Sequence, residues 1–118
     1  MVDPEIRDII MRFVGALTSR GIRVEKVILY GSYALENTHS GSDIDLAIVS
    51  PDFGKDRFEE GKILFQIAWR VDPRIEPIPI SLESYEKDTW LPIIYEIKQK
   101  GIEISLVGDV VWGMGLGI

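Results

Sequence analysis

The residues that decide the fold run from 27 to 49 and read VILYGS-YALENTHSGS-DIDLAIV. The segment from Val24 to Tyr30 is rich in β-branched and aromatic residues and ends in the apolar run from Val27 to Tyr30, which predicts a strand buried on both faces. A second strand is predicted from Asp43 to Val49, where two aspartates alternate with apolar residues. The segment between the strands ends in small and polar side chains, which favour turns, so we expect a loop there.

Gly31 and Ser32 directly follow the first predicted strand. Glycine allows a tight turn at the strand end and lets a phosphate group approach the backbone. We expect a short helix from about Ser32 to Glu36, whose free N–H groups favour an anion together with the Ser32 hydroxyl. These residues therefore predict a phosphate-binding turn.

Asp43 and Asp45 lie two residues apart on the second predicted strand, so their side chains share one face while Ile44 and Leu46 point into the core. Two carboxylates this close repel each other unless a divalent cation lies between them. Mg²⁺ prefers one or two carboxylates together with substrate phosphates. The pair therefore predicts a site for Mg²⁺ and a nucleotide, facing the phosphate-binding turn.

A third strand is predicted from Ile75 to Ile80, and Pro77 and Pro79 place it at a sheet edge because proline cannot donate to a strand ladder. Glu76 lies on this strand, and proximity to the aspartates would make it the third carboxylate of a two-metal site. The alternative is a solvated side chain on an edge strand. Arg74, two residues earlier on the same face, either neutralises phosphate charge or pairs with Glu76 at the surface.

Helical periodicity fills most of the remaining chain. A first helix is predicted to start at Asp3-Pro4-Glu5 and to end before Gly21, with one apolar stripe. A second is predicted from Arg57 to Val71 and a third from about Trp90 to Lys100, followed by a short strand from Ile102 to Leu106. The order of helices and strands indicates a two-layer α/β domain around a small sheet.

Three aromatic side chains of the second predicted helix share a helical spacing: Phe58, Phe65 and Trp69. Large apolar side chains at such a spacing are typical of a helix face that packs on a core. We therefore expect them to be buried, rather than to form a platform for stacking bases.

The composition describes one globular domain of 118 residues and 13.4 kDa, with 46% hydrophobic residues. A net charge of −6 and a pI near 4.7 make attraction to a polyanion unfavourable, which excludes a general nucleic-acid binder. The chain has no cysteine, so disulfides, thiolate metal sites and cysteine nucleophiles are excluded. Because neither a signal sequence nor a membrane-spanning apolar stretch is found, we expect a cytoplasmic protein.

We expect one domain from residue 1 to 108 and a tail from 109 to 118, in which glycine alternates with large apolar side chains. Such a segment suits neither a stable helix nor a strongly specified strand. The tail is either disordered or part of an interface, where a partner helix or a second copy of the chain would cover it.

The Gly-Ser turn, the ten residues after it and the Asp-x-Asp pair form one signature, filled by Gly31, Ser32, Asp43 and Asp45. With this signature the sequence resembles the minimal nucleotidyltransferases of the DNA-polymerase-β superfamily, over at least residues 24–80. The resemblance implies a mixed sheet flanked by helices, two aspartates that bind Mg²⁺ and a Gly-Ser turn that holds the nucleotide triphosphate. It also implies a third acid on a later strand, for which Glu76 is the candidate.

The resemblance further implies a partner. Many such proteins are antitoxins that pair with a HEPN-type toxin RNase, and the better-studied members inactivate it by transferring AMP from ATP to a tyrosine hydroxyl. One departure concerns the residues after the Gly-Ser pair. Members often have a small residue and then Ala-Arg-Gly, whereas this chain has Tyr33-Ala34-Leu35-Glu36 and so lacks the arginine.

We therefore predict an enzyme that uses two Mg²⁺ ions to move AMP from ATP to a hydroxyl of a partner protein. Its catalytic and metal-binding residues would be Asp43, Asp45 and Glu76, and its nucleotide-binding residues Gly31, Ser32 and Arg74. Two alternatives stay open. One is a binding module of the same fold that neutralises a toxin by covering it, which the missing arginine favours. The other is a nucleotidyltransferase for small-molecule hydroxyls, which usually needs a second domain and so a longer chain.

Overall fold

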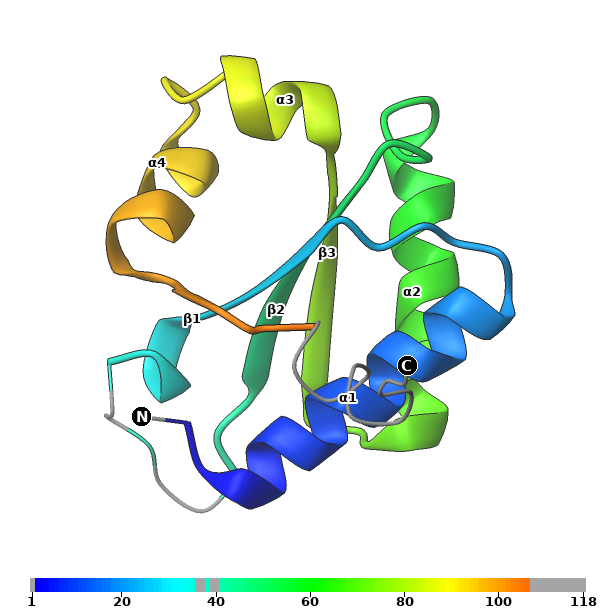
Figure 1. Ribbon diagram of the computed structural model, residues 1–118, viewed down its shortest axis with the longest axis vertical. Coiled ribbons are helices and arrows are strands. Elements are labelled where there is room, and N and C mark those ends of the chain that lie inside the picture. Colours follow the sequence, from blue (N-terminus) through cyan, green and yellow to red (C-terminus); the bar gives the residue numbers. More distant parts are fainter. Residues whose placement is uncertain (1, 36–37, 39–40, 107–118) are drawn as a thin grey trace, which may run out of the picture.

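A four-stranded mixed sheet runs through the middle of the molecule, and helices cover both of its faces (Figure 1). The computed structural model describes residues 2–35, 38 and 41–106. Its elements in chain order are α1 (Pro4–Ser19), β1 (Lys26–Tyr30), a 3-10 turn η1 (Gly31–Tyr33), β2 (Ile44–Ser50), α2 (Arg57–Val71), β3 (Ile75–Ser81), α3 (Leu82–Lys87), α4 (Pro92–Lys100) and β4 (Ile102–Glu103). The tail expected at 109–118 lies outside the described residues.

The strands lie in the order β3-β2-β1-β4. β1 pairs antiparallel with both β2 and β4, whereas β2 pairs parallel with β3. A parallel pair needs a long crossover, and α2 provides it. β3 is an edge strand, as Pro77 and Pro79 predict. The expected fold class, an α/β domain with a small mixed sheet flanked by helices, is confirmed.

The two faces of the sheet carry two separate hydrophobic cores. The larger core joins the strands to α1 and α2, and its strand residues include Leu29 and Leu46. The smaller core lies on the other face, where Ala47 of β2 and Ile94 of α4 belong to one buried cluster. Because side chains alternate along a strand, Asp45 projects from the face of the smaller core.

α1 begins and ends where the sequence predicts. The Asp3 carboxylate accepts a hydrogen bond from the Glu5 N–H at 2.7 Å, and Pro4 is the first helical residue. Gly21 takes a φ of 85° just after the last turn. The predicted apolar stripe is buried and consists of Ile6, Ile9, Ile10, Phe13, Val14 and Leu17.

α2 has the predicted bounds, but its buried face differs from the predicted one. Phe58, Phe65 and Trp69 are 81%, 52% and 60% exposed, so the expectation that they pack into the core is wrong. A Cβ added at Gly61 would lie only 3.8 Å from Pro79, so α2 lies close to β3 and leaves little room for rings between them. Smaller side chains fill the buried face instead: Leu64, Ile67 and Ala68.

Two elements near the end of the described chain are shorter than expected. α4 begins at Pro92 rather than at about Trp90, because proline is tolerated in a helix only within the first turn. β4 ends at Glu103 rather than Leu106. Beyond it, the Ser105 carbonyl accepts a hydrogen bond from the Arg7 guanidinium of α1 at 3.0 Å instead of continuing a strand ladder.

α3 is a helix of six residues that no pattern in the sequence predicts. It starts where Ser81 ends β3, and the Ser81 hydroxyl accepts a hydrogen bond from the Ser84 N–H at 3.1 Å. None of the helices in the described part of the chain is long and apolar enough to span a bilayer.

Candidate active site

Three strands bring polar side chains into one row at one end of the sheet. In the strand register, Tyr30 of β1 is paired with Asp45 of β2, and Asp45 is paired with Glu76 of β3. Paired residues of neighbouring strands point to the same face, so these three side chains are neighbours. Asp43, two residues before Asp45, is directed to that face as well. The register therefore brings Glu76 beside the aspartate pair.

Gly31 packs directly against this row. Its φ of 72° lies in the left-handed region, which favours glycine. A Cβ added at Gly31 would overlap the Asp45 carboxylate, so any other residue would displace that side chain. Backbone conformation and close approach thus both require glycine here. The chain turns tightly at the same point where a carboxylate reaches the surface.

Asp45 lies in an unfavourable electrostatic environment. Burial raises the pKa of its carboxyl group above the ordinary value, and the charges of Glu76, Asp43 and Glu96 raise this pKa further. We call Asp43, Asp45, Glu76 and Glu96 the acidic cluster. Within residues 2–35, 38 and 41–106, no lysine or arginine forms an ion pair with any member. The cluster therefore costs folding free energy and favours a cation.

Two residues of this region, Tyr30 and Glu96, were not among the predicted site residues. Burial, followed by the charges of Asp45, Glu96 and Glu76, raises the pKa of Tyr30 to about 12. Tyr30 could have been found, because it ends the strand next to the Gly-Ser turn. Glu96 carries no sequence signal, since only the packing of α4 on β1 brings its charge near Asp45.

The acidic cluster suits a hard divalent cation, because every member offers carboxylate oxygens. Among the described residues, no three carboxylate or imidazole side chains converge closely enough to hold a metal ion by themselves. Mg²⁺ does not need such a cage, since it takes one or two carboxylates and completes its shell with water and substrate phosphates. Asp43 and Asp45 are the residues that would hold it, with Glu76 beside them.

Within the described residues, the turn predicted to bind phosphate is shorter than expected. In place of a helix from Ser32 to Glu36, residues Gly31–Tyr33 form a single 3-10 turn. The N–H groups of Ala34 and Leu35 both donate to the Gly31 carbonyl at 3.1 Å. One turn has little of the macrodipole of a full helix, so a phosphate here would depend on individual N–H groups and on the partly buried Ser32.

Arg74 does not pair with Glu76, so the surface pair considered for it is wrong. Its guanidinium donates two hydrogen bonds to Asp72, at 3.0 and 3.1 Å, which hold the pKa of the Asp72 carboxyl below its usual range. The Arg74 carbonyl accepts the Ile44 N–H at 2.8 Å, next to the aspartate pair. Tyr33 is near enough to act on the guanidinium pKa. Glu5 of α1 acts on this pKa as well, so the guanidinium lies toward Asp72, Tyr33 and the start of α1.

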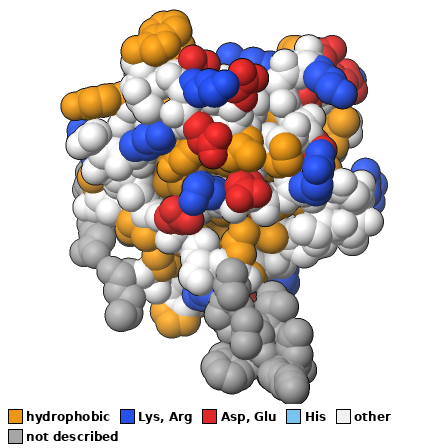
Figure 2. All heavy atoms as spheres, turned by 45° about the horizontal axis from the view of Figure 1, so that its top comes forward, with side chains coloured by type: hydrophobic (Ala, Val, Ile, Leu, Met, Phe, Trp, Pro, Cys, Tyr) orange, Lys and Arg blue, Asp and Glu red, His pale blue; other side chains and the backbone are white. Residues whose placement is uncertain are grey.

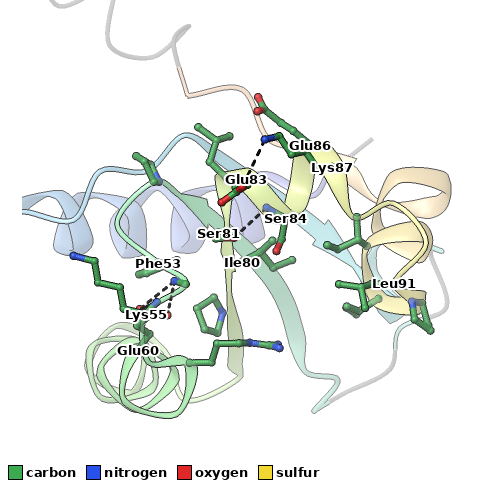
Figure 3. A pocket seen from close by; sticks show the side chains of 18 residues that line it. Phe53, Lys55, Glu60, Ile80, Ser81, Glu83, Ser84, Glu86, Lys87 and Leu91 are labelled. Carbon is green, nitrogen blue, oxygen red and sulfur yellow. Dashed lines mark hydrogen bonds and ion pairs between the residues drawn. The ribbon is translucent and has the colours of Figure 1, made fainter.

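A groove of about 680 Å³ lies at the opposite end of the parallel strand pair (Figure 3). It runs between the loop after β2, the end of β3, α3 and the start of α4. The Glu60 carboxylate accepts hydrogen bonds from the N–H groups of residues 54–56 at 3.0 to 3.2 Å, and Glu83 pairs with Lys87 at 3.6 Å. Apolar side chains and charges of both signs share this face (Figure 2). Three glutamates line the groove, but Glu60 and Glu83 already have partners, so the acidic cluster is the better candidate for a metal site.

A family model described as "Nucleotidyltransferase domain" matches residues 10–111 of the chain. The matched range includes Gly31, Ser32, the acidic cluster and most of the fold. No functionally curated protein is similar enough in sequence to serve as a relative.

Solved structures share the fold at low sequence identity. A protein from Sulfolobus solfataricus, provisionally described as a nucleotidyltransferase, has a TM-score of 0.58 and 16% identity, over 84% of this chain and 78% of its own. A toxin–antitoxin structure with AMP-PNP has a TM-score of 0.57 and 16% identity, over 93% of this chain and 81% of its own. The toxin–antitoxin MntA-HpeT, as a mutant with two aspartates changed to glutamate, has a TM-score of 0.53 and 17% identity, over 89% of this chain and 79% of its own.

Proposed function

The chain belongs to the nucleotidyltransferase domain family, and from this premise we propose that it transfers AMP from ATP to a hydroxyl group of a partner protein. The acidic cluster beside Gly31 is the observation that carries the proposal. It combines carboxylates from neighbouring strands, a glycine turn in contact with one of them, and no ion pair from a described lysine or arginine. Nucleotidyl transfer uses such an arrangement, because a triphosphate must be held and its charge neutralised.

Asp43, Asp45 and Glu76 would hold two Mg²⁺ ions, which supply charge neutralisation and lower the pKa of the acceptor hydroxyl. Gly31, Ser32 and Arg74 would hold the phosphates. Glu76 would also take the proton of the acceptor hydroxyl. The acceptor oxygen forms a bond to the α-phosphorus, the bond from that phosphorus to the bridging oxygen breaks, and pyrophosphate leaves with the electron pair.

The proposed acceptor is a tyrosine of a HEPN-type toxin, for which this chain would be the antitoxin. Two of the structural neighbours are toxin–antitoxin structures, and one of them is with AMP-PNP, which supports both an adenine nucleotide and a toxin partner. Asp43 and Glu76 are exposed at the end of the sheet. A hydroxyl presented by another protein's surface can therefore reach them without entering a deep cleft.

The test uses ATP labelled at the α-phosphate, with Mg²⁺, the protein and an extract of its host. We expect one protein band to take up label, and the same reaction with label at the γ-phosphate to leave that band unlabelled. Asp43→Asn/Asp45→Asn should abolish labelling while far-UV circular dichroism stays unchanged. The matched control, Glu83→Gln/Glu86→Gln, removes two acids at the groove end and should label normally. Labelling that survives Asp43→Asn/Asp45→Asn would overturn the proposal.

A second candidate is a binding module that neutralises a toxin without catalysis. It is favoured by Leu35, which stands where many family members have arginine and whose apolar side chain is 59% exposed. This function predicts that Asp43→Asn/Asp45→Asn still binds and neutralises the partner. The enzymatic function predicts that the same variant binds it but no longer neutralises it.

A further inference from the structure

The outer face of α2 carries an aromatic stripe, by which we mean Phe58, Phe65 and Trp69. These side chains are exposed, and they lie on the helix that covers the larger core. The acidic cluster projects from the other face of the sheet. Nucleotidyl transfer at that cluster therefore does not explain why three large aromatic side chains face solvent, where they cost solubility.

The stripe runs straight along the helix, with the exposed Lys62 between Phe58 and Phe65. Residues seven and eleven positions apart fall within about 40° of each other around a helix and span about 16 Å along it. The rings of Phe65 and Trp69 are 6.2 Å apart. Next to them, Arg20, Gln66 and Arg70 complete an open groove of about 640 Å³. The C-terminal half of α2 thus offers a recess, and its N-terminal half offers a projecting ring, Phe58.

Charge along this face changes sign from one end of α2 to the other. Glu59 lies in its first turn, and Arg70 lies at its end next to Arg20, the C-cap residue of α1. Among the described residues, the side chains of Glu59, Arg70 and Arg20 take part in no ion pair. Arg57 lines the 680 Å³ groove at the other end of the strands instead. An antiparallel second helix of the same sequence would therefore meet opposite charges at both ends.

We propose that α2 packs against α2 of a second copy of this chain, antiparallel and around a two-fold axis near residue 64. Phe58 of each copy then enters the groove beside Trp69 of the other. Glu59 of each copy lies beside Arg70 of the other, and Lys62 lies over the Phe65 ring. A two-fold interface requires a self-complementary surface. This helix face provides one, because a projecting ring meets a recess and an acidic end meets a basic end.

The contact is limited to one helix from each copy, less than the roughly 800 Å² per partner of a standard stable interface. The dimer therefore dissociates on dilution. Both acidic clusters stay open, because they project from the opposite faces of the two sheets.

Sedimentation velocity at concentrations from roughly 2 to 500 µM tests this pairing. The mass of the wild-type chain should rise from 13.4 kDa toward twice that value as concentration increases. Phe65→Ser/Trp69→Ser should raise the dimer dissociation constant at least about tenfold, since aromatic residues dominate such contacts. The matched control, Trp90→Ser/Tyr95→Ser, changes two exposed aromatics away from α2 and should leave the constant unchanged.

A charge exchange tests the antiparallel arrangement. Arg70→Glu alone and Glu59→Arg alone should each weaken the dimer about tenfold, because like charges then meet across the axis. Glu59→Arg/Arg70→Glu should restore the dissociation constant to within about threefold of wild type. Circular dichroism of each variant checks that α2 remains folded. A mass that stays at that of a monomer, an equal loss in the Trp90/Tyr95 control or a failed restoration would each overturn the proposal.

Discussion

The two ends of the parallel pair β2–β3 differ in whether their carboxylates have ion-pair or hydrogen-bond partners. At the end where these strands begin, Asp45 and Glu76 are neighbours and have no ion pair within the described chain. At the end where they finish, each of three acids has a partner: Asp52 pairs with Arg23 at 2.6 Å, Glu83 with Lys87, and Glu60 with three backbone N–H groups. The 680 Å³ groove lies at this second, largely neutralised end, where Glu86 is the one lining glutamate with no ion pair or hydrogen bond among the described residues. The contrast teaches that unpaired charge, more than cavity size, is what makes the acidic cluster our proposed site of transfer.

The sharpest test of this contrast removes one carboxylate from each end. Glu76→Gln should lower the rate of AMP transfer about 10²- to 10³-fold, because a positioned acid or base typically contributes that much. Glu86→Gln, which changes an acid lining the groove, should stay within about twofold of wild type. Initial rates with α-labelled ATP measure both. Equal losses in the two variants would erase the distinction between the ends.

Gly31→Ala should cause the next largest effect. It forces an alanine into the left-handed region, at about 1–2 kcal/mol, and its Cβ also displaces the Asp45 carboxylate, so stability and transfer activity should both fall. Gly21→Ala is the matched control, since Gly21 has φ 85° but nothing within 4 Å of an added Cβ. In urea unfolding, Gly21→Ala should lose less free energy of unfolding than Gly31→Ala, and its transfer activity should stay intact. Similar losses of activity would mean that the overlap with Asp45 is unimportant.

At the neutralised end, Glu60→Ala should lower the free energy of unfolding by about 1–2 kcal/mol without changing the transfer rate. The carboxylate satisfies the backbone N–H groups of residues 54–56, which would otherwise lose their acceptor. Glu59→Ala is the control: it removes an acid from the same helical turn that accepts no such bonds. Chemical denaturation at a few micromolar measures both variants. A slower transfer in Glu60→Ala would show that the two ends are coupled.

The smallest expected effect is a gain of stability at the site itself. The pKa of Asp45 is raised in the folded state, so its protonated form stabilises the fold, and this stability is lost as the pH rises from the ordinary value of 3.8 through the raised value. At neutral pH, the free energy of unfolding of Asp45→Asn should therefore be higher than that of wild type by up to about 1 kcal/mol. This is the size expected when like charges on neighbouring strands are relieved. Unfolding in EDTA at several pH values should show the difference shrinking toward pH 4.

Addition of Mg²⁺ provides the control for this gain. Mg²⁺ should stabilise wild type more than Asp45→Asn and so reduce the difference at neutral pH. A variant less stable than wild type in EDTA at neutral pH would contradict the view that the acidic cluster is uncompensated.

The sequence predicted much of the site because its parts are local. The spacing of Asp43 and Asp45 places both on one strand face, and the two prolines of β3 assign that strand to an edge. The position of Glu76 also followed once β3 was placed next to β2. These inferences need only the alternation of side chains along a strand and the missing N–H group of proline. Both can be read directly from the sequence.

The remaining errors concern side chains whose surroundings come from distant segments. Phe58 and Leu64 both lie on helically spaced apolar rows of α2, and periodicity alone does not say which row faces the sheet. The close contact at Gly61 with β3 decides it. Glu96 reaches the site only through the packing of α4. Arg74 pairs with Asp72 rather than Glu76 because the Asp72 carboxylate is only two residues away.

The prolines of β3 have a consequence for the behaviour of the protein at high concentration. Pro77 and Pro79 have no N–H group, so the open edge of β3 lacks two donors that an added strand would need. The opposite edge strand of the described sheet, β4, is only two residues long. Within the described sheet, neither edge offers a long row of donors for amyloid-like growth. Aggregation by strand addition is therefore disfavoured even in a crowded cell, and recognition of other molecules is left to helices and turns.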